Sequence, residues 1–316
     1  MLYRQQIMTQ FFWNSYKRLE REVLSLSEVI HVSDDQLGVY SSKIGDLLVR
    51  TAIECEALSK ELYHANGGTK PNGKDLYFDT DCFGLLEKKW KICKKKILVT
   101  SPYLYFQNEG NRVLTPLYKA NKRGSSSSNW QKAYQAVKHD RVKSLKSGNI
   151  GNLLLAMGAL YVLNIYYRDY NFPLVADKDA SDVDWGLGSE LFAVKVSSES
   201  DGASCRAIYE KKRDYDECIY FVKHTDQTGQ AFIDLFSKIQ EKVNADAAKN
   251  ATQIIQEAFR SGRMVGSLSL NDDKIQTILD EQFKKSFQLI GKQYGRGLAN
   301  ALQAFKFEAV LNKQQY

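Results

Sequence analysis

The sequence predicts a mainly α-helical protein with a small antiparallel β insertion and a helical C-terminal extension. Only 4 of the 316 residues are proline, so long stretches are free to form helices. Apolar residues recur at steps of three and four between residues 36 and 65, which is the period of an amphipathic helix. Residues 152–167 are almost entirely apolar, as in a helix buried in a protein core. A composition of 43% hydrophobic and 26% charged residues is that of an ordinary globular protein.

Residues 1–35 predict an N-terminal helix. The aromatic run Phe11-Phe12-Trp13 stands among charged side chains and lacks a small-residue cleavage site, so we expect no signal peptide. The five cysteines form no Cys-x-x-Cys pair, and their odd number leaves at least one thiol outside any intramolecular disulfide scheme. Both observations favour reduced thiols and a cytoplasmic protein.

Residues 36–65 predict one long helix. Ser33 is a candidate N-cap because Gln36 follows three residues later, and Asn66-Gly67-Gly68 is a stop signal. The periodic apolar positions are Leu37, Tyr40, Ile44, Leu47, Leu48, Ala52, Cys55, Leu58 and Leu62.

The next segments alternate between loop and helix. Residues 66–78 have the composition of a surface loop, and a second helix is expected over about 80–96. Residues 97–118 look extended and irregular, because they combine two prolines with an aromatic run.

Two further helices complete a predicted bundle over residues 36–170. The first covers 129–141 and is capped by Ser128 or Asn129. The second is the apolar run 152–167, whose 16 residues fall short of the roughly 20 that a membrane span needs. We therefore expect a buried core helix and no membrane contact.

Residues 171–228 predict an acidic loop followed by a small antiparallel sheet or hairpin. The acids of the loop lack the glycine and glutamate spacing of a calcium-binding loop, so we interpret them as solvated. They are Asp177, Asp179, Asp182 and Asp184, and the β-prone segments are 191–196, 205–209 and 218–222. Residues 229–316 return to a helical pattern, with breaks at Ser261-Gly262 and at 267–271.

Basic residues concentrate between 119 and 146. This segment holds eight Lys or Arg side chains and one acid, Asp140, whereas residues 174–222 are rich in acids. Such a segment suits a polyanionic partner. The alternative is a solvated basic face that binds nothing specific. The eight bases are Lys119, Lys122, Arg123, Lys132, Lys138, Arg141, Lys143 and Lys146.

The sequence Lys138-His139-Asp140-Arg141 groups acid–base and phosphate-binding side chains. Neighbouring cations disfavour the imidazolium, so we expect His139 to be a neutral base at pH 7. Lysine and arginine beside it can hold a phosphodiester, which is sufficient for metal-independent cleavage of RNA through the ribose 2′-hydroxyl. The alternative is that His139 and Arg141 bond the last carbonyl groups of a helix. On a helix Tyr134 shares a face with Lys138, and Gln135 with His139.

Residues 36–170 resemble the HEPN superfamily of small helical bundles, many of which are toxin or phage-defence ribonucleases. The shared features are a long first helix with Glu54 and Glu56 on one face, a basic cluster around a histidine, and an apolar last helix. Catalytic HEPN domains carry an arginine, four to six residues and then a histidine, where this chain has Lys138-His139-Asp140-Arg141. The resemblance implies that His139 is the base, Arg141 or Lys138 the phosphate clamp, and Glu54 or Glu56 the orienting residue.

These observations predict an RNA-directed defence or stress protein, acting as a metal-independent endoribonuclease through His139. The alternative is a non-catalytic HEPN-like module that docks a nucleic acid or a partner protein from the same operon. Burial discriminates between them, because a catalytic His139 borders a cleft and a structural one is enclosed with its nitrogens bonded to backbone. Supporting roles are expected for Tyr134 and Asp140, and RNA contacts for Arg123, Lys132, Lys143 and Lys146.

The resemblance also implies a homodimer, since HEPN-like bundles commonly pair, and the 152–167 helix is the expected contact. The four histidines stand at no metal-ligand spacing from a cysteine. We therefore expect neither a metal site nor a cofactor.

Overall fold

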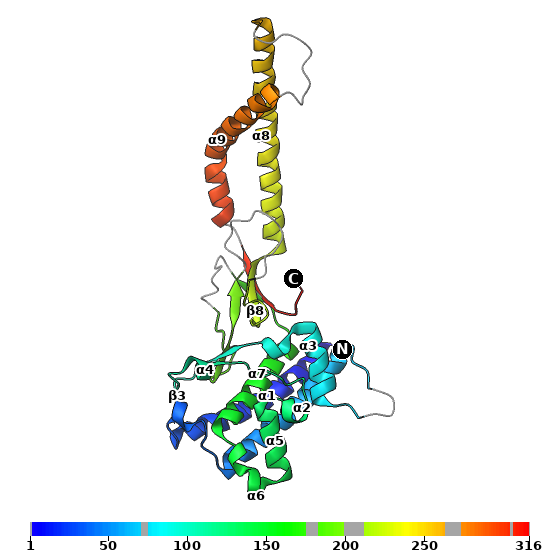
Figure 1. Ribbon diagram of the computed structural model, residues 1–316, viewed down its shortest axis with the longest axis vertical. Coiled ribbons are helices and arrows are strands. Elements are labelled where there is room, and N and C mark those ends of the chain that lie inside the picture. Colours follow the sequence, from blue (N-terminus) through cyan, green and yellow to red (C-terminus); the bar gives the residue numbers. More distant parts are fainter. Residues whose placement is uncertain are drawn as a thin grey trace.

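The computed structural model describes residues 2–70, 75–174, 183–198, 212–262, 273–303 and 306–315. The chain forms a helical body, a layer of short strands next to it, and a long two-helix hairpin that projects from the strands (Figure 1). The predicted fold class, mainly α-helical, is confirmed.

The body is built around one central helix. Its four main helices are α1 (Leu2–Leu24), α2 (Ser42–Ala65), α5 (Asn129–His139) and α7 (Ile150–Arg168). Helix α7 packs against the other three, and 14 of its 19 residues are buried. By length and composition alone α7 is apolar enough to cross a membrane, but 78% of its apolar window is buried inside the protein, as in the core helix of a soluble protein. The prediction of a buried core helix is confirmed.

Helix α2 begins later than the sequence predicted. Ser41 is its N-cap and accepts a hydrogen bond from the amide of Ile44 at 3.2 Å. Ser33 instead precedes a 3₁₀ turn, η2 (Asp34–Gln36), where its side chain makes no capping hydrogen bond. The carboxylate of Asp34 accepts hydrogen bonds from the amides of residues 107 and 108, at 2.8 and 3.2 Å. This tertiary contact holds the segment outside the helix, so the predicted start at 36 was wrong. The predicted end at Asn66 is confirmed.

The helix expected over 80–96 is shorter than predicted. A π turn, η3 (Phe78–Phe83), leads into α3 (Gly84–Trp90), which ends at Lys91 with a φ of 54°. The side chain of Glu87 then accepts a hydrogen bond from the amide of Cys93 at 2.8 Å. The chain is thereby turned towards the strands.

The strands do not form the local antiparallel insertion that the sequence predicted. One sheet has the order β4-β2-β6, another has the order β5-β9-β8-β7, and β7 pairs with β8 in parallel. Their bounds are β2 (Ile97–Val99), β4 (Val113–Leu114), β5 (Phe172–Leu174), β6 (Phe192–Val194), β7 (Val196–Ser198), β8 (Tyr220–His224) and β9 (Phe307–Leu311). The prediction was wrong because β6 pairs with β2 and β8 with β9, segments far away in the sequence.

The helical hairpin consists of α8 (Asp226–Arg260) and α9 (Asp273–Gln303). The predicted break at Ser261-Gly262 is confirmed. The C-terminal residues were predicted to be helical, but they form β9, whose Ala309 and Leu311 are buried by the period-two alternation of a strand. Because α8 follows β8 and α9 precedes β9, both ends of the hairpin are fixed to adjacent strands.

Short elements connect these parts. They are η1 (Ser25–Glu28), β1 (Val32–Ser33), η4 (Ile92–Lys94), β3 (Leu104–Tyr105), α4 (Glu109–Arg112), η5 (Gly124–Ser126), α6 (Arg141–Ser144) and η6 (Leu145–Ser147). The β-prone segment 205–209, the acids at 177, 179 and 182, and the predicted break at 267–271 lie outside the described residues.

Candidate functional site

Helix α5 carries most of the predicted site residues, and its start is fixed by a capping box. The hydroxyl of Ser128 accepts a hydrogen bond from the amide of Gln131 at 3.3 Å, and Gln131 Oε1 accepts one from the amide of Ser128 at 3.2 Å. Trp130 is fully buried and anchors the inner face of the helix. The outer face leaves Lys132 and His139, seven residues apart, exposed on one side.

His139 is the last residue of α5 and is exposed. Its Nε2 lies 3.2 Å from Oε1 of Gln135, the i, i+4 neighbour that the sequence predicted. The ring is not among the residues that line the groove beside α5, and it is not enclosed with its nitrogens bonded to backbone. His139 therefore has neither of the two environments that the sequence analysis distinguished.

The residues that follow His139 turn to separate contacts. Asp140 caps the short helix α6 by accepting a hydrogen bond from the amide of Lys143 at 3.3 Å. Arg141 forms an ion pair with Asp46 of α2 on the protein surface. The four consecutive side chains of the Lys-His-Asp-Arg sequence thus do not converge on one point.

Lys138 instead lies in a shallow groove, the α2 groove, of about 530 Å³. Its Nζ donates a hydrogen bond to the hydroxyl of Tyr134 at 3.2 Å, as the predicted i, i+4 pair. That hydrogen bond, with a smaller contribution from the charge of Glu56, raises the pKa of Lys138. Glu56 also accepts a hydrogen bond from Lys60 at 2.8 Å. The lining residues are Phe12, Val49, Ile53, Glu56, Ala57, Lys60, Glu61, Tyr134 and Lys138.

Glu54 lies away from the α5 residues. It lines a second groove, of about 590 Å³, together with Arg18 and Arg50 from α1 and α2. Burial raises the pKa of the Glu54 carboxyl, and the charge of Arg18 opposes the rise. Of the two glutamates that the resemblance assigns to orientation, only Glu56 lies beside an α5 site residue, and that residue is Lys138.

Arg123 is also held away from the end of α5. Its guanidinium stacks on the ring of Tyr77, 3.8 Å from the centroid, and its Nε lies 3.8 Å from a carboxylate oxygen of Asp79. Arg123 therefore braces the η3 turn.

Exposed basic side chains gather where α5, α6 and η6 meet, and Lys132 extends this surface about two turns back along α5. This surface, the cationic corner, lies at the end of the body opposite the hairpin (Figure 1). Its residues are Lys132, His139, Arg141, Lys143 and Lys146, all exposed. Lys132 and Lys146 form no ion pair with any described residue, and Lys143 is 85% exposed with Nζ 3.7 Å from Asp140. Exposed cations with few acid partners can bind phosphate groups.

No group of three or more His, Cys, Asp or Glu side chains in the described ranges could hold a metal ion.

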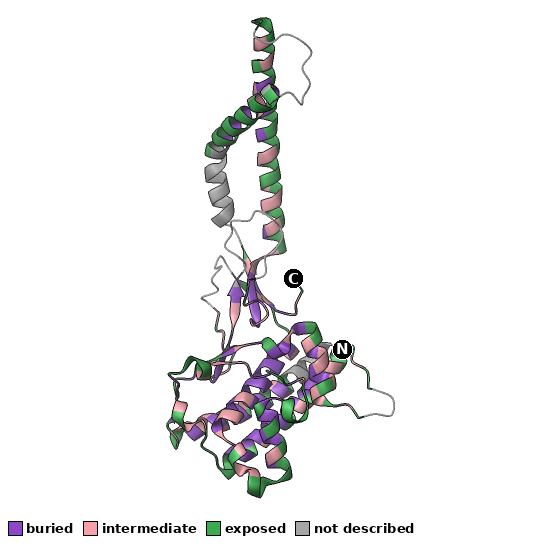
Figure 2. Ribbon diagram, viewed as in Figure 1, coloured by how far each residue is buried: buried purple, intermediate pink, exposed green. Residues whose placement is uncertain are grey.

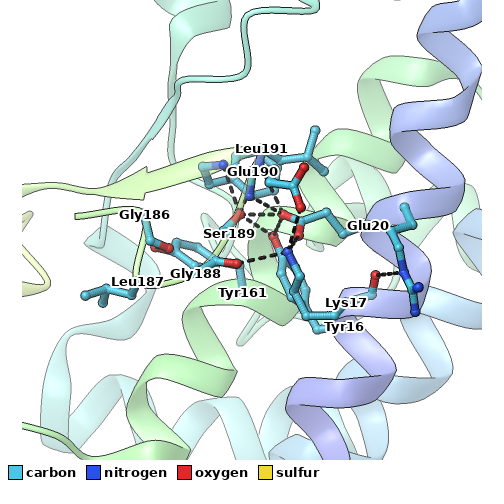
Figure 3. Close-up of polar contacts among 12 residues, drawn as sticks. Tyr16, Lys17, Glu20, Tyr161, Gly186, Leu187, Gly188, Ser189, Glu190 and Leu191 are labelled. Carbon is cyan, nitrogen blue, oxygen red and sulfur yellow. Dashed lines mark hydrogen bonds and ion pairs between the residues drawn. The ribbon is translucent and has the colours of Figure 1, made fainter. Parts of the chain in front are cut away.

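A buried polar cluster around Glu20 of α1 was missed in the sequence (Figure 3). Glu20 is 0% exposed. Its Oε1 accepts hydrogen bonds from the hydroxyls of Tyr16 at 2.8 Å and Ser189 at 2.6 Å, and from the amides of residues 190 and 191 at 2.9 and 3.1 Å. Lys17 donates to its Oε2 at 2.5 Å.

This cluster fixes α1 to the loop that precedes β6. Both carboxylate oxygens are occupied by groups of the protein itself, so the arrangement is structural and positions the strand layer against the body. The sequence signal was the place of Glu20 within the apolar stripe of α1, between the buried Tyr16 and Val23.

Comparison of the chain with protein-family models, with curated proteins and with solved structures found no match. The resemblance to the HEPN superfamily thus rests on the sequence pattern alone.

Proposed function

We propose that the protein is a non-catalytic RNA-binding module and that the cationic corner is its RNA-binding surface. The observation that carries the proposal is the exposure of Lys132, Lys143 and Lys146, of which only Lys143 lies within ion-pair distance of a described acid, Asp140. Flexible exposed lysines bind the phosphates of a single strand without reading its sequence. That the bound nucleic acid is RNA rests on the resemblance to the HEPN superfamily.

The positions of the other site residues favour binding over cleavage. Cleavage through the 2′-hydroxyl needs a base and a cation that reach the same phosphodiester. Here the imidazole of His139 faces Gln135, Lys138 faces Tyr134 in the α2 groove, and Arg141 is paired with Asp46. The endoribonuclease hypothesis would require His139 and one of the two cations, Lys138 or Arg141, to leave their partners together.

The test is binding of a fluorescent single-stranded RNA by anisotropy. The triple variant Lys132→Gln/Lys143→Gln/Lys146→Gln removes three phosphate contacts. Because fewer counterions are then released on binding, the affinity should fall by about 100-fold near 0.1 M salt. A matched control, Lys88→Gln/Lys238→Gln/Lys249→Gln, removes the same charge from exposed lysines elsewhere. We expect the control to bind at least tenfold more tightly than the corner variant, by the same estimate. Equal losses would contradict a local binding surface.

A second measurement separates binding from catalysis. Purified protein and His139→Ala are incubated with a mixed RNA pool in EDTA, and we expect intact RNA from both. Cleavage that disappears in His139→Ala would overturn the non-catalytic proposal and restore the endoribonuclease. Absence of RNA binding by the parent protein would favour the alternative in which the corner docks an acidic partner protein.

A further inference from the structure

The hairpin of α8 and α9 is long and stands clear of the body (Figure 1). The helices contain 35 and 31 residues, so the shorter one extends about 46 Å at 1.5 Å per residue. They run antiparallel, and Ser286 of α9 donates a hydrogen bond to Asp246 of α8 at 2.8 Å. The two helices contact each other more than they contact the rest of the chain.

The described part of the contact between α8 and α9 is made by small, polar and branched aliphatic side chains. Helix α8 contributes Val243, Ala247 and Ala251, and α9 contributes Ile275, Gln282, Ser286 and Ile290. Among the described side chains that are buried there, none is aromatic. Such a contact brings the helices close but buries little apolar area, so it stabilises a free-standing hairpin weakly.

Several large apolar side chains of the hairpin remain exposed. Phe287 is 49% and Leu289 65% exposed, and the rings of Phe283 and Phe287 stack at 6.4 Å along one side of α9. Figure 2 shows exposed residues along α8 and along the part of α9 whose side chains are described, in contrast with the body. The other exposed large side chains are Phe236, Ile254 and Phe259. The stacked pair of Phe283 and Phe287 is a contiguous apolar strip on a projecting element, and such a strip marks an interaction surface.

We propose that this surface binds the hairpin of a second copy of the chain and that the two hairpins form a four-helix bundle. The charges favour a second copy, because α8 carries five acids and four bases while α9 carries three acids and five bases. The net charges are opposite, and a two-fold axis sets each α8 against the α9 of the other copy. In this knobs-into-holes packing, the exposed phenylalanines of one hairpin fill the spaces beside the small residues of the other.

The available area is sufficient for a stable dimer. A face about 46 Å long and two helix diameters of about 10 Å wide gives about 900 Å² per copy. Stable interfaces bury about 800 Å² per partner. The predicted contact through the 152–167 helix is wrong for the described fold, because α7 is enclosed by its own chain. The hairpin provides the surface that α7 does not.

The experiment measures the mass of the full chain in solution by light scattering at micromolar concentration. We expect twice the chain mass of 36.0 kDa for the parent protein and the single-chain mass for Phe283→Asp/Phe287→Asp. The control Gln253→Asp/Gln288→Asp adds the same charge at exposed polar positions of the hairpin and should remain a dimer. A monomeric parent, a dimeric Phe variant or a mass above two chains would each overturn the proposal.

A second measurement covers the case in which the Phe variant fails to fold. Hydrogen exchange of the parent protein at two concentrations should slow in α8 and α9 at the higher one, because only the dimer protects these amides. Equal exchange at both concentrations would overturn the proposal as well. The outcome is independent of RNA binding, since the corner and the hairpin lie at opposite ends of the molecule.

Discussion

Replacing Glu20 by glutamine should destabilise the helical body by about 2–4 kcal/mol. The carboxylate is 0% exposed and accepts hydrogen bonds from Tyr16, Lys17, Ser189 and two loop amides. Glutamine has nearly the same shape, so the change removes charge and one acceptor without opening a cavity. The amide nitrogen would face the ammonium of Lys17, where two donors cannot bond.

The magnitude follows from the difference between charged and neutral hydrogen bonds. Bonds to a charged group contribute about 1.5–3 kcal/mol and neutral ones about 0.5–1.5 kcal/mol. The substitution loses the Lys17 hydrogen bond and weakens the other four. It also removes the desolvation cost of a buried charge, and this gain reduces the net loss of stability to about 2–4 kcal/mol. Glu22, two residues further along α1, provides the matched control. Its ion pair with Arg50 at 2.8 Å joins side chains that are 40% and 52% exposed, so Glu22→Gln should cost about 0.2–1 kcal/mol.

The assay is urea unfolding followed by tryptophan fluorescence. Trp13 stacks on Tyr16 with ring centroids 5.0 Å apart and therefore reports on the Glu20 cluster. The midpoint of Glu20→Gln should fall clearly below that of Glu22→Gln at an unchanged slope. Equal midpoints for the two variants would refute the reasoning, because burial and the five donors would then carry no extra stability.

Three further outcomes follow from the body. Burial raises the pKa of the Cys82 and Cys93 thiols to about 12, so neither thiol should react with iodoacetamide at pH 8 until the protein unfolds. Detection of label on either cysteine of the native protein by mass spectrometry would contradict this. A Cβ on Gly148 would lie 2.8 Å from the backbone of α2, so Gly148→Ala should cost about 1–3 kcal/mol, whereas Gly84→Ala meets no atom within 4 Å and should be neutral or stabilising in thermal unfolding. The folded-state pKa of Glu54 is raised above 4.5, so the free energy of unfolding should fall as pH rises from 4.5 through that pKa. Glu54→Gln should flatten this part of the stability–pH curve, and an unchanged slope in the variant would count against the assignment.

Local signals in the sequence located the helices of the body. The N-cap of α5, the stop at Asn66 and the apolar run of α7 each lie within a few residues of the feature that they specify. The sequence located all three, with Ser128 as one of two candidates for the N-cap. The i, i+4 neighbours of α5 were found for the same reason, because helix geometry alone sets them.

Features set by distant parts of the chain were missed. Strand β9 looked helical because it follows a long helix, and only its pairing with β5 and β8 makes it a strand. The role of Glu20 depends on Ser189, 169 residues away, which no local pattern connects. The separation of His139 from Arg141 arises from the end of α5 at residue 139, which turns Arg141 towards Asp46.

The salt dependence of RNA binding tests the central claim most directly. The logarithm of the association constant should fall linearly with the logarithm of salt concentration, by about 0.7 per phosphate contact on a single strand. The slope of Lys132→Gln/Lys143→Gln/Lys146→Gln should therefore be shallower than that of the parent protein by about 2. Equal slopes for the two proteins, or a parent affinity that does not change with salt, would contradict the cationic corner as the RNA-binding surface.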